Sequence, residues 1–108
     1  MGGFIKGDIV VVPFPFSDLT GRKRRPALVI KNLKGNNLIL CQITAHGRDI
    51  YSIILKKQDY EEGSLRKSSY IQPDMIFTMD INIIAYKAAR IKKSKMQEVL
   101  NKLFEIIS

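Results

Sequence analysis

The sequence from Gly7 to Ile30 reads GDIVVVPFPFSDLTGRKRRPALVI. It holds two short runs of β-branched and aliphatic residues, Ile9–Val12 and Ala27–Ile30, a composition that favours buried strands. Residues 13–24 between them contain two prolines, a glycine and several small polar side chains, the composition of a long loop. This stretch therefore predicts a strand, a long loop and a second strand.

The chain continues in short extended segments. Gly35-Asn36-Asn37 is a turn signal followed by an apolar run up to Thr44, so residues 26–44 are predicted to form a hairpin. Further extended segments are predicted at residues 51–55, 69–72, 75–78 and 85–91, with a turn at 61–64. Five or six short strands separated by turn signals indicate a small barrel or sandwich.

The end of the chain changes to helical spacing. The apolar positions are Met96, Val99, Leu100, Leu103 and Ile107. The polar positions, predicted to lie largely on the other side, are Lys95, Glu98, Asn101, Lys102 and Glu105. Ser94 and Gln97 fit a capping box, which predicts a helix that begins at Ser94. We therefore expect one mainly β domain over residues 1–108, with one C-terminal α-helix.

The charge of the chain points to polyanionic partners. The 18 Lys and Arg residues exceed the 10 Asp and Glu residues and give a formal net charge of +8. Such an excess attracts nucleic acid, although a basic surface that serves solubility is the alternative. Six cations fall within residues 22–34, where no acidic residue stands: Arg22, Lys23, Arg24, Arg25, Lys31 and Lys34. This concentration favours nucleic-acid binding.

Several function classes are poorly supported. Cys41 is the one cysteine, so no intramolecular disulfide can form, and its apolar neighbours predict a buried structural thiol. With one cysteine and one histidine, His46, the usual zinc sites cannot form within a single chain, and we predict no metal and no cofactor. Neither a nucleophile-elbow sequence nor a glycine-rich phosphate loop is present. Without a run of membrane-spanning or signal-peptide length, we expect a cytoplasmic protein with no membrane partner.

Three motifs in order resemble the opening of PemK/MazF toxins of type II toxin–antitoxin systems. They are the GDIV strand, the PFPFSDLTG loop and the RPALVI strand, all at the spacing of that family. Ile43-Thr44-Ala45 resembles the second motif of the family, and residues 69–80 follow its later pattern more loosely. The resemblance covers essentially the whole chain. It implies a small SH3-like β-barrel of the CcdB/PemK-like kind with a C-terminal α-helix.

The resemblance also implies an activity. Toxins of this family are endoribonucleases, or mRNA interferases, that cut single-stranded RNA without a metal, form homodimers and are inhibited by a cognate antitoxin. The RNA 2′-OH is the implied nucleophile, leaving a cyclic phosphate and a 5′-hydroxyl. The family's catalytic arginine and threonine match Arg25 and Thr44, and the loop over residues 14–24 is implied to cover the RNA groove. The net charge of +8 predicts that the antitoxin is acidic and partly disordered.

The chemistry of the individual residues agrees with these roles. The Arg25 guanidinium stays protonated and could stabilise charge on a reacting phosphate, although it could equally be a solvated charge or a simple phosphate contact. The Thr44 hydroxyl could orient the same phosphate, whereas its alternative role is that of an ordinary strand residue. Histidine ordinarily exchanges a proton near neutral pH, and His46 would share a face with Thr44 if the strand continued. His46 is therefore the tentative base, with a polar loop residue as the alternative.

RNA binding is predicted for the loop between the first two strands. The predicted contacts are Phe16, Ser17, Arg22, Lys23 and Arg24, because aromatic rings beside cations can stack on unpaired bases. Phe14 is predicted to cap the barrel core instead, and Phe16 could do so as well. Two departures from the family pattern bear on substrate preference: His46 replaces the commoner glutamine, and residues 81–84 lack the usual basic side chains.

Two rival functions remain at this point. One is a non-catalytic toxin that poisons DNA gyrase, since the same fold family includes gyrase inhibitors. The other is a plain nucleic-acid-binding barrel. The Arg25-Pro26 and Thr44 motifs favour the nuclease over both.

Overall fold

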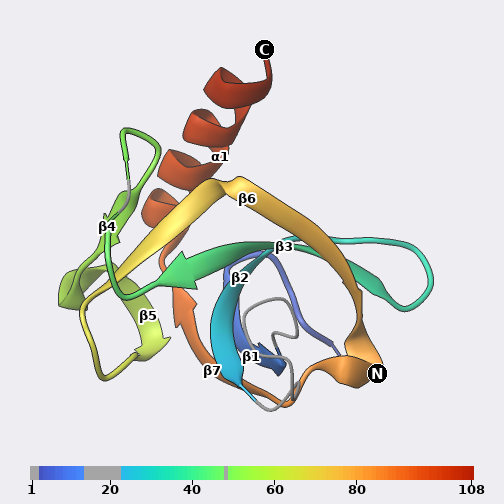
Figure 1. Ribbon diagram of the computed structural model, residues 1–108. Coiled ribbons are helices and arrows are strands. Elements are labelled where there is room, and N and C mark those ends of the chain that lie inside the picture. The colour runs from blue at the N-terminus through green and yellow to red at the C-terminus, as the bar shows by residue number, and fades with distance from the viewer. Residues whose placement is uncertain (1–2, 14–22, 48) are drawn as a thin grey trace.

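The computed structural model describes residues 3–13, 23–47 and 49–108. Over these residues the chain forms one seven-stranded sheet of the order β4-β6-β3-β2-β1-β7-β5, in which all neighbours are antiparallel (Figure 1). The strands are β1 (Asp8–Pro13), β2 (Arg24–Asn32), β3 (Asn37–Thr44), β4 (Ile53–Leu55), β5 (Tyr60–Gly63), β6 (Ser69–Asp80) and β7 (Tyr86–Ile91). Two short 3₁₀ turns, η2 (Lys57–Asp59) and η3 (Ile81–Ile83), and the helix α1 (Lys93–Ile107) complete these elements. The predicted mainly β fold with one C-terminal helix is confirmed.

The predicted hairpin over residues 26–44 is present as β2 and β3. Gly35 has a φ of +81° in the turn between them, a conformation that L side chains rarely adopt. The turn predicted at residues 61–64 is wrong. These residues fall largely in β5, which pairs with β7. Gly63 is required there, because a Cβ atom at this position would lie 2.6 Å from the Ala88 carbonyl oxygen.

A large bulge in β6 accounts for the curvature of the sheet. Cys41 of β3 pairs with Ile76, whereas the next residue, Gln42, pairs with Gln72. Residues 73–75 are therefore extra on β6, and bulges of this kind bend a strand and raise its twist. β6 accordingly arches across β3, and the sheet curls into a half-barrel (Figure 1). The separate extended segments predicted at 69–72 and 75–78 are the two arms of this one strand.

Both faces of the curled sheet are apolar. Successive residues of β2 alternate between two clusters, with Leu28 and Ile30 in one and Ala27 and Val29 in the other. The first cluster also contains Met96 and Val99 of α1, so the helix covers this face. The second cluster lies on the opposite face, where it comprises Val10, Val12, Ala27, Val29, Leu38 and Leu40. Because both faces are buried, the strands read as continuous apolar runs.

The start of α1 differs from the sequence prediction. The helix begins at Lys93 with Lys92 as its N-cap, so Ser94 lies inside the first turn and is not the cap. The reason is a tertiary contact: the Lys92 N–H donates to the Asp59 carbonyl oxygen at 2.8 Å, which fixes the chain before the helix. No helix in the described residues combines the length and apolar character needed to cross a membrane.

Lys95 is buried, although the helical pattern places it with the polar positions. Only 9% of its side chain is exposed, and its Nζ contacts Asp59 Oδ2 at 3.3 Å and Glu98 Oε1 at 2.9 Å. It also donates to the Ile54 carbonyl oxygen at 3.1 Å. Glu98 thus pairs with Lys95, and this buried cation joins α1 to β4 and η2.

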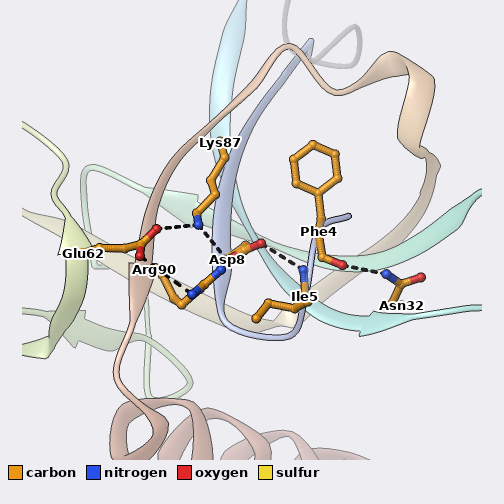
Figure 2. Close-up of polar contacts among 7 residues, drawn as sticks. All are labelled: Phe4, Ile5, Asp8, Asn32, Glu62, Lys87 and Arg90. Atoms are coloured by element: carbon orange, nitrogen blue, oxygen red, sulfur yellow. Dashed lines mark hydrogen bonds and ion pairs between the residues drawn. The ribbon is translucent and has the colours of Figure 1, made fainter. Parts of the chain in front are cut away.

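A buried carboxylate connects the N-terminal turn with three strands (Figure 2). Asp8 is 1% exposed; its Oδ2 accepts the Ile5 N–H at 2.9 Å, and its Oδ1 accepts Arg90 Nε at 2.8 Å. Lys87 Nζ lies 3.6 Å from the same Oδ1 atom, and Glu62 of β5 contacts both cations. The hydrogen bond from Lys87 holds the pKa of the Glu62 carboxyl below its ordinary value. β1, β7 and β5 therefore meet at one charge network.

Replacing Asp8 with alanine should lower the free energy of unfolding by about 3 kcal/mol, because Arg90 and Lys87 would lose their buried counter-charge. The matched control is Glu105→Ala, which removes a 72% exposed partner of Lys102 and should cost less than about 1 kcal/mol. Urea unfolding followed by circular dichroism measures both losses. Equal losses for the two variants would contradict the role given to Asp8.

Candidate functional site

Arg25 and Thr44 lie at the open end of the β2–β3 hairpin, away from its turn. The pairing of β2 with β3 runs as far as Ala27 opposite Gln42. Arg25 and Thr44 each stand two residues beyond this last pair, Arg25 on β2 and Thr44 on β3. On its other side Arg25 pairs with Val12 of β1. The two residues that the sequence predicts as a catalytic pair therefore lie at the same end of two neighbouring strands.

The alternation of the strands determines the face on which this pair lies. Arg25 and Thr44 each stand two residues from Ala27 and Gln42, so all four share one face of the sheet. That face carries the cluster to which Ala27 and Val12 belong, and the pair lies at the end of this cluster. Both Arg25 and Thr44 are half-buried.

The hydroxyl of Thr44 closes the turn that follows β3. Its Oγ1 donates to the His46 carbonyl oxygen at 2.6 Å, and the chain bends after Thr44 instead of continuing as a strand. The condition under which His46 would share a face with Thr44 is therefore not met. His46 is exposed in this bend. Because the only proton of the Thr44 hydroxyl is used within the turn, its oxygen is available as an acceptor.

Tyr70 extends the row formed by Arg25 and Thr44, and the sequence analysis did not place it at the site. It pairs with Thr44 on one side and with Ile54 of β4 on the other. Its ring packs on the turn after β3, since a Cβ atom at Gly47 would lie 3.0 Å from Tyr70 Cε2. The apolar pattern around residues 69–71 indicates a strand, but only the pairing register identifies Thr44 as its neighbour.

A buried glutamine fastens the start of β4 to the bulge of β6. Gln72 is fully buried, accepts a hydrogen bond from the Ser52 hydroxyl through Oε1, and donates from Nε2 to Asp74 Oδ1 at 2.8 Å. Just before Ser52, the Asp49 carboxylate accepts the Tyr51 N–H at 2.9 Å. The connection from β3 to β4 is therefore anchored at Thr44 on one side and at Ser52 on the other.

Cys41 has no part in this site. It is fully buried, as predicted, and burial together with the Asp74 carboxylate raises the pKa of its thiol far above the ordinary range. A thiol held in its neutral form is a poor nucleophile. Within residues 3–13, 23–47 and 49–108, no group of three or more His, Cys, Asp or Glu side chains is placed to hold a metal ion.

Of the remaining predicted RNA contacts, some lie within the described residues and some lie outside them. Phe16, Ser17 and Arg22, together with Phe14, lie outside the described residues. Lys23 and Arg24 are exposed immediately before Arg25, and Arg24 pairs with Pro13 of β1. Two exposed cations therefore lie between Arg25 and the first loop.

Comparisons with known proteins identify the family and the fold of the chain. Residues 5–107 match the family model of the PemK-like, MazF-like toxins of type II toxin–antitoxin systems. The crystal structure of MazE–MazF (Form-II) from Deinococcus radiodurans contains a similar chain, with a TM-score of 0.76 at 18% identity, covering 100% of this chain and 98% of that one. No curated protein matches the sequence.

Two mycobacterial structures are similar in fold. One, an endoribonuclease, has a TM-score of 0.74 at 14% identity and covers 97% of this chain and 91% of that one. The other, an endoribonuclease in complex with its cognate antitoxin, has a TM-score of 0.71 at 12% identity and covers 98% of this chain and 93% of that one. These likenesses show the fold, and the family match extends over nearly the whole sequence. The chain belongs to the PemK-like, MazF-like toxins of type II toxin–antitoxin systems.

Proposed function

We propose that this toxin is an endoribonuclease that cleaves single-stranded RNA without a metal ion, by attack of the RNA 2′-OH on the neighbouring phosphate. The observation that supports the proposal is the placement of Arg25 and Thr44 at the same end of the neighbouring strands β2 and β3, with Tyr70 paired to Thr44. The similar mycobacterial structures are named endoribonucleases, which supports the same reading.

In the proposed reaction the 2′-oxygen forms a bond to phosphorus while the bond from phosphorus to the 5′-oxygen breaks. The 2′-OH proton passes to a base, and the departing 5′-oxygen takes up a proton, so the products are a cyclic phosphate and a 5′-hydroxyl. Negative charge builds on the non-bridging oxygens in the transition state. The forked donors of Arg25 stabilise that charge, but a permanently protonated guanidinium cannot serve as the base.

Thr44 and His46 receive different roles. Thr44 holds the turn after β3 through its bond to the His46 carbonyl. To position the phosphate beside Arg25, the Thr44 hydroxyl rotates away from this carbonyl and donates to a phosphate oxygen. His46 is exposed in the same turn, and its imidazole is the candidate acceptor of the 2′-OH proton. Lys23 and Arg24 bind the RNA backbone together with Ser17 and Arg22 of the first loop, and the ring of Phe16 stacks on an unpaired base. The half-buried ring of Tyr70 offers a surface on which an unpaired base can stack.

Two partners complete the proposal. Helix α1 leaves Phe104 70% exposed and Ile107 69% exposed, apolar surface that a second copy of the chain would cover in a homodimer. The net charge of +8 suits an acidic antitoxin that covers the cationic end of β2 and excludes RNA.

Arg25→Ala should lower kcat by about 10²–10³, the loss typical of removing one donor to a developing oxyanion, while the circular dichroism spectrum stays unchanged. Thr44→Ala should be milder, because its hydroxyl acts through the turn. A fluorogenic single-stranded RNA measures the rates, and Lys31→Ala, an exposed cation near the other end of β2, is the matched control. Cleavage by Arg25→Ala at the rate of the unmodified protein would overturn this site.

In the same series, the variant His46→Gln tests whether His46 accepts the 2′-OH proton or has no part in the reaction. If His46 accepts the proton, the variant should be strongly impaired and its rate should lose the dependence on pH that an ionising base confers. Near-normal activity with an unchanged pH profile would remove His46 from the mechanism and leave Arg25 in place.

The chemistry of attack can be tested on the substrate. One 2′-deoxy sugar at the cleaved position should make an RNA inert, because it removes the nucleophile. Addition of EDTA should leave the rate on unmodified RNA unchanged, since the described residues provide no cluster of metal ligands. Activity that EDTA abolishes and Mg²⁺ restores would contradict the proposal, as would cleavage of the 2′-deoxy substrate.

The antitoxin proposal predicts that the protein encoded next to this toxin is acidic. It should inhibit RNA cleavage, and its affinity should fall as salt is raised, because charge attraction contributes to the complex. Isothermal titration at two salt concentrations and an RNA cleavage assay measure these effects. A basic partner, or one that binds without inhibition, would contradict the idea.

A further inference from the structure

A second concentration of positive charge lies where β4 ends and β6 begins. A groove of about 440 Å³ opens there between the two connections that flank η2 and β5. We define the basic groove by its four cations, Lys56, Lys57, Arg66 and Lys67. All four are exposed, and the hydroxyls of Ser64 and Ser68 line the same groove. No acidic residue is among its lining residues.

Strand pairing brings the two basic pairs together. Leu55, the last residue of β4, pairs with Ser69, the first residue of β6. Lys56 and Lys57 therefore leave the sheet at the point where Arg66 and Lys67 approach it. In the sequence these pairs are separated by η2 and β5, so neither pair alone indicates a site.

The charges of the basic groove are not neutralised within the described part of the chain, where none of the four cations forms an ion pair. Of the three acids between the two basic pairs in the sequence, Glu61 is exposed and the other two contact other cations. Asp59 of η2 contacts the buried Lys95, and Glu62 of β5 contacts Lys87 and Arg90. The Asp59 carboxylate also accepts the Lys56 N–H at 2.7 Å. The four side chains are therefore not paired with an acid of the described chain and can contact an external anion.

The basic groove lies beside the Arg25–Thr44 row. Tyr70 of β6 pairs with Thr44, and Lys67 precedes Tyr70 by three residues, roughly 10 Å of extended chain. Ile54, the other partner of Tyr70, is itself a lining residue of the groove. A strand of nucleic acid held at Thr44 can thus continue over Tyr70 into the groove.

We propose that the basic groove binds the backbone phosphates of RNA nucleotides that flank the cleaved bond, as an accessory site next to the catalytic row. This inference rests on the proposed ribonuclease function. RNA is favoured over an acidic peptide, because each nucleotide carries a phosphate, and clustered cations with hydroxyl neighbours suit a repeating anion. The groove therefore raises the affinity for longer RNA and does not discriminate between base sequences.

The test uses the full chain and RNA analogues that cannot be cleaved. Fluorescein-labelled 2′-O-methyl oligouridylates of about 4 and about 16 nucleotides span the site sizes of small nucleic-acid-binding barrels. The variant Lys56→Ala/Lys57→Ala removes two charges from the groove. The matched control, Lys31→Ala/Lys34→Ala, removes two exposed charges near the turn of the β2–β3 hairpin, at the opposite end of β3 from Thr44. Both variants have the same net charge.

We expect the groove variant to bind the longer oligonucleotide at least about fivefold more weakly than the control variant. The slope of log K against log salt concentration should become shallower by about 1.4, because two phosphate contacts are lost and each contributes about 0.7. The shorter oligonucleotide should bind equally to both variants. With long cleavable RNA, the groove variant should have an unchanged kcat at saturation and a higher KM than the control variant.

Equal affinity of the two variants for the longer oligonucleotide would overturn the proposal, even if the protein cleaves RNA normally. Loss of antitoxin affinity without loss of RNA affinity would overturn it as well, since the groove would then belong to the protein partner. Because binding is measured without cleavage, a protein that binds through the groove but never cuts RNA contradicts only the proposed function. Absence of any RNA binding contradicts both.

Discussion

The buried carboxylate of Asp8 is the interaction on which the arrangement of the sheet depends. It holds Arg90 of β7 and the N–H of Ile5, and through Arg90 and Lys87 it connects to Glu62 on the edge strand β5. A charge buried to this degree is tolerated only when it is paired and hydrogen-bonded, so the surrounding strands have little freedom to move apart. β1 is fixed between β2 and β7 as a result.

The position of the candidate site follows from that placement of β1. Val12 of β1 pairs with Arg25, so the strand that Asp8 anchors also supports the guanidinium at the start of β2. On the other side, the bulge of β6 sets the register that places Tyr70 beside Thr44. The candidate site therefore lies at one end of the sheet, and the basic groove lies beside it at β4 and the start of β6.

Local sequence patterns were sufficient for most of the fold. The runs at Ile9–Val12 and Ala27–Ile30 and the turn at Gly35 depend on neighbouring residues only, and all three are confirmed. Residues 60–63 form a strand despite a polar, turn-like composition, because β7 supplies the pairing. Lys95 is buried because Asp59, far from it in the sequence, neutralises its charge. Such long-range partners leave no local signal.

The same distinction applies to the site. Arg25 and Thr44 are marked by family motifs within residues 7–44, and the β2–β3 pairing places these two positions at the same end of neighbouring strands. Analysis of the ends of RNA fragments by mass spectrometry tests the central claim most directly, because the ends record which nucleophile attacked. Attack by the 2′-OH beside Arg25 predicts fragments with 2′,3′-cyclic phosphate and 5′-hydroxyl ends. Fragments with 3′-hydroxyl and 5′-phosphate ends would contradict the account.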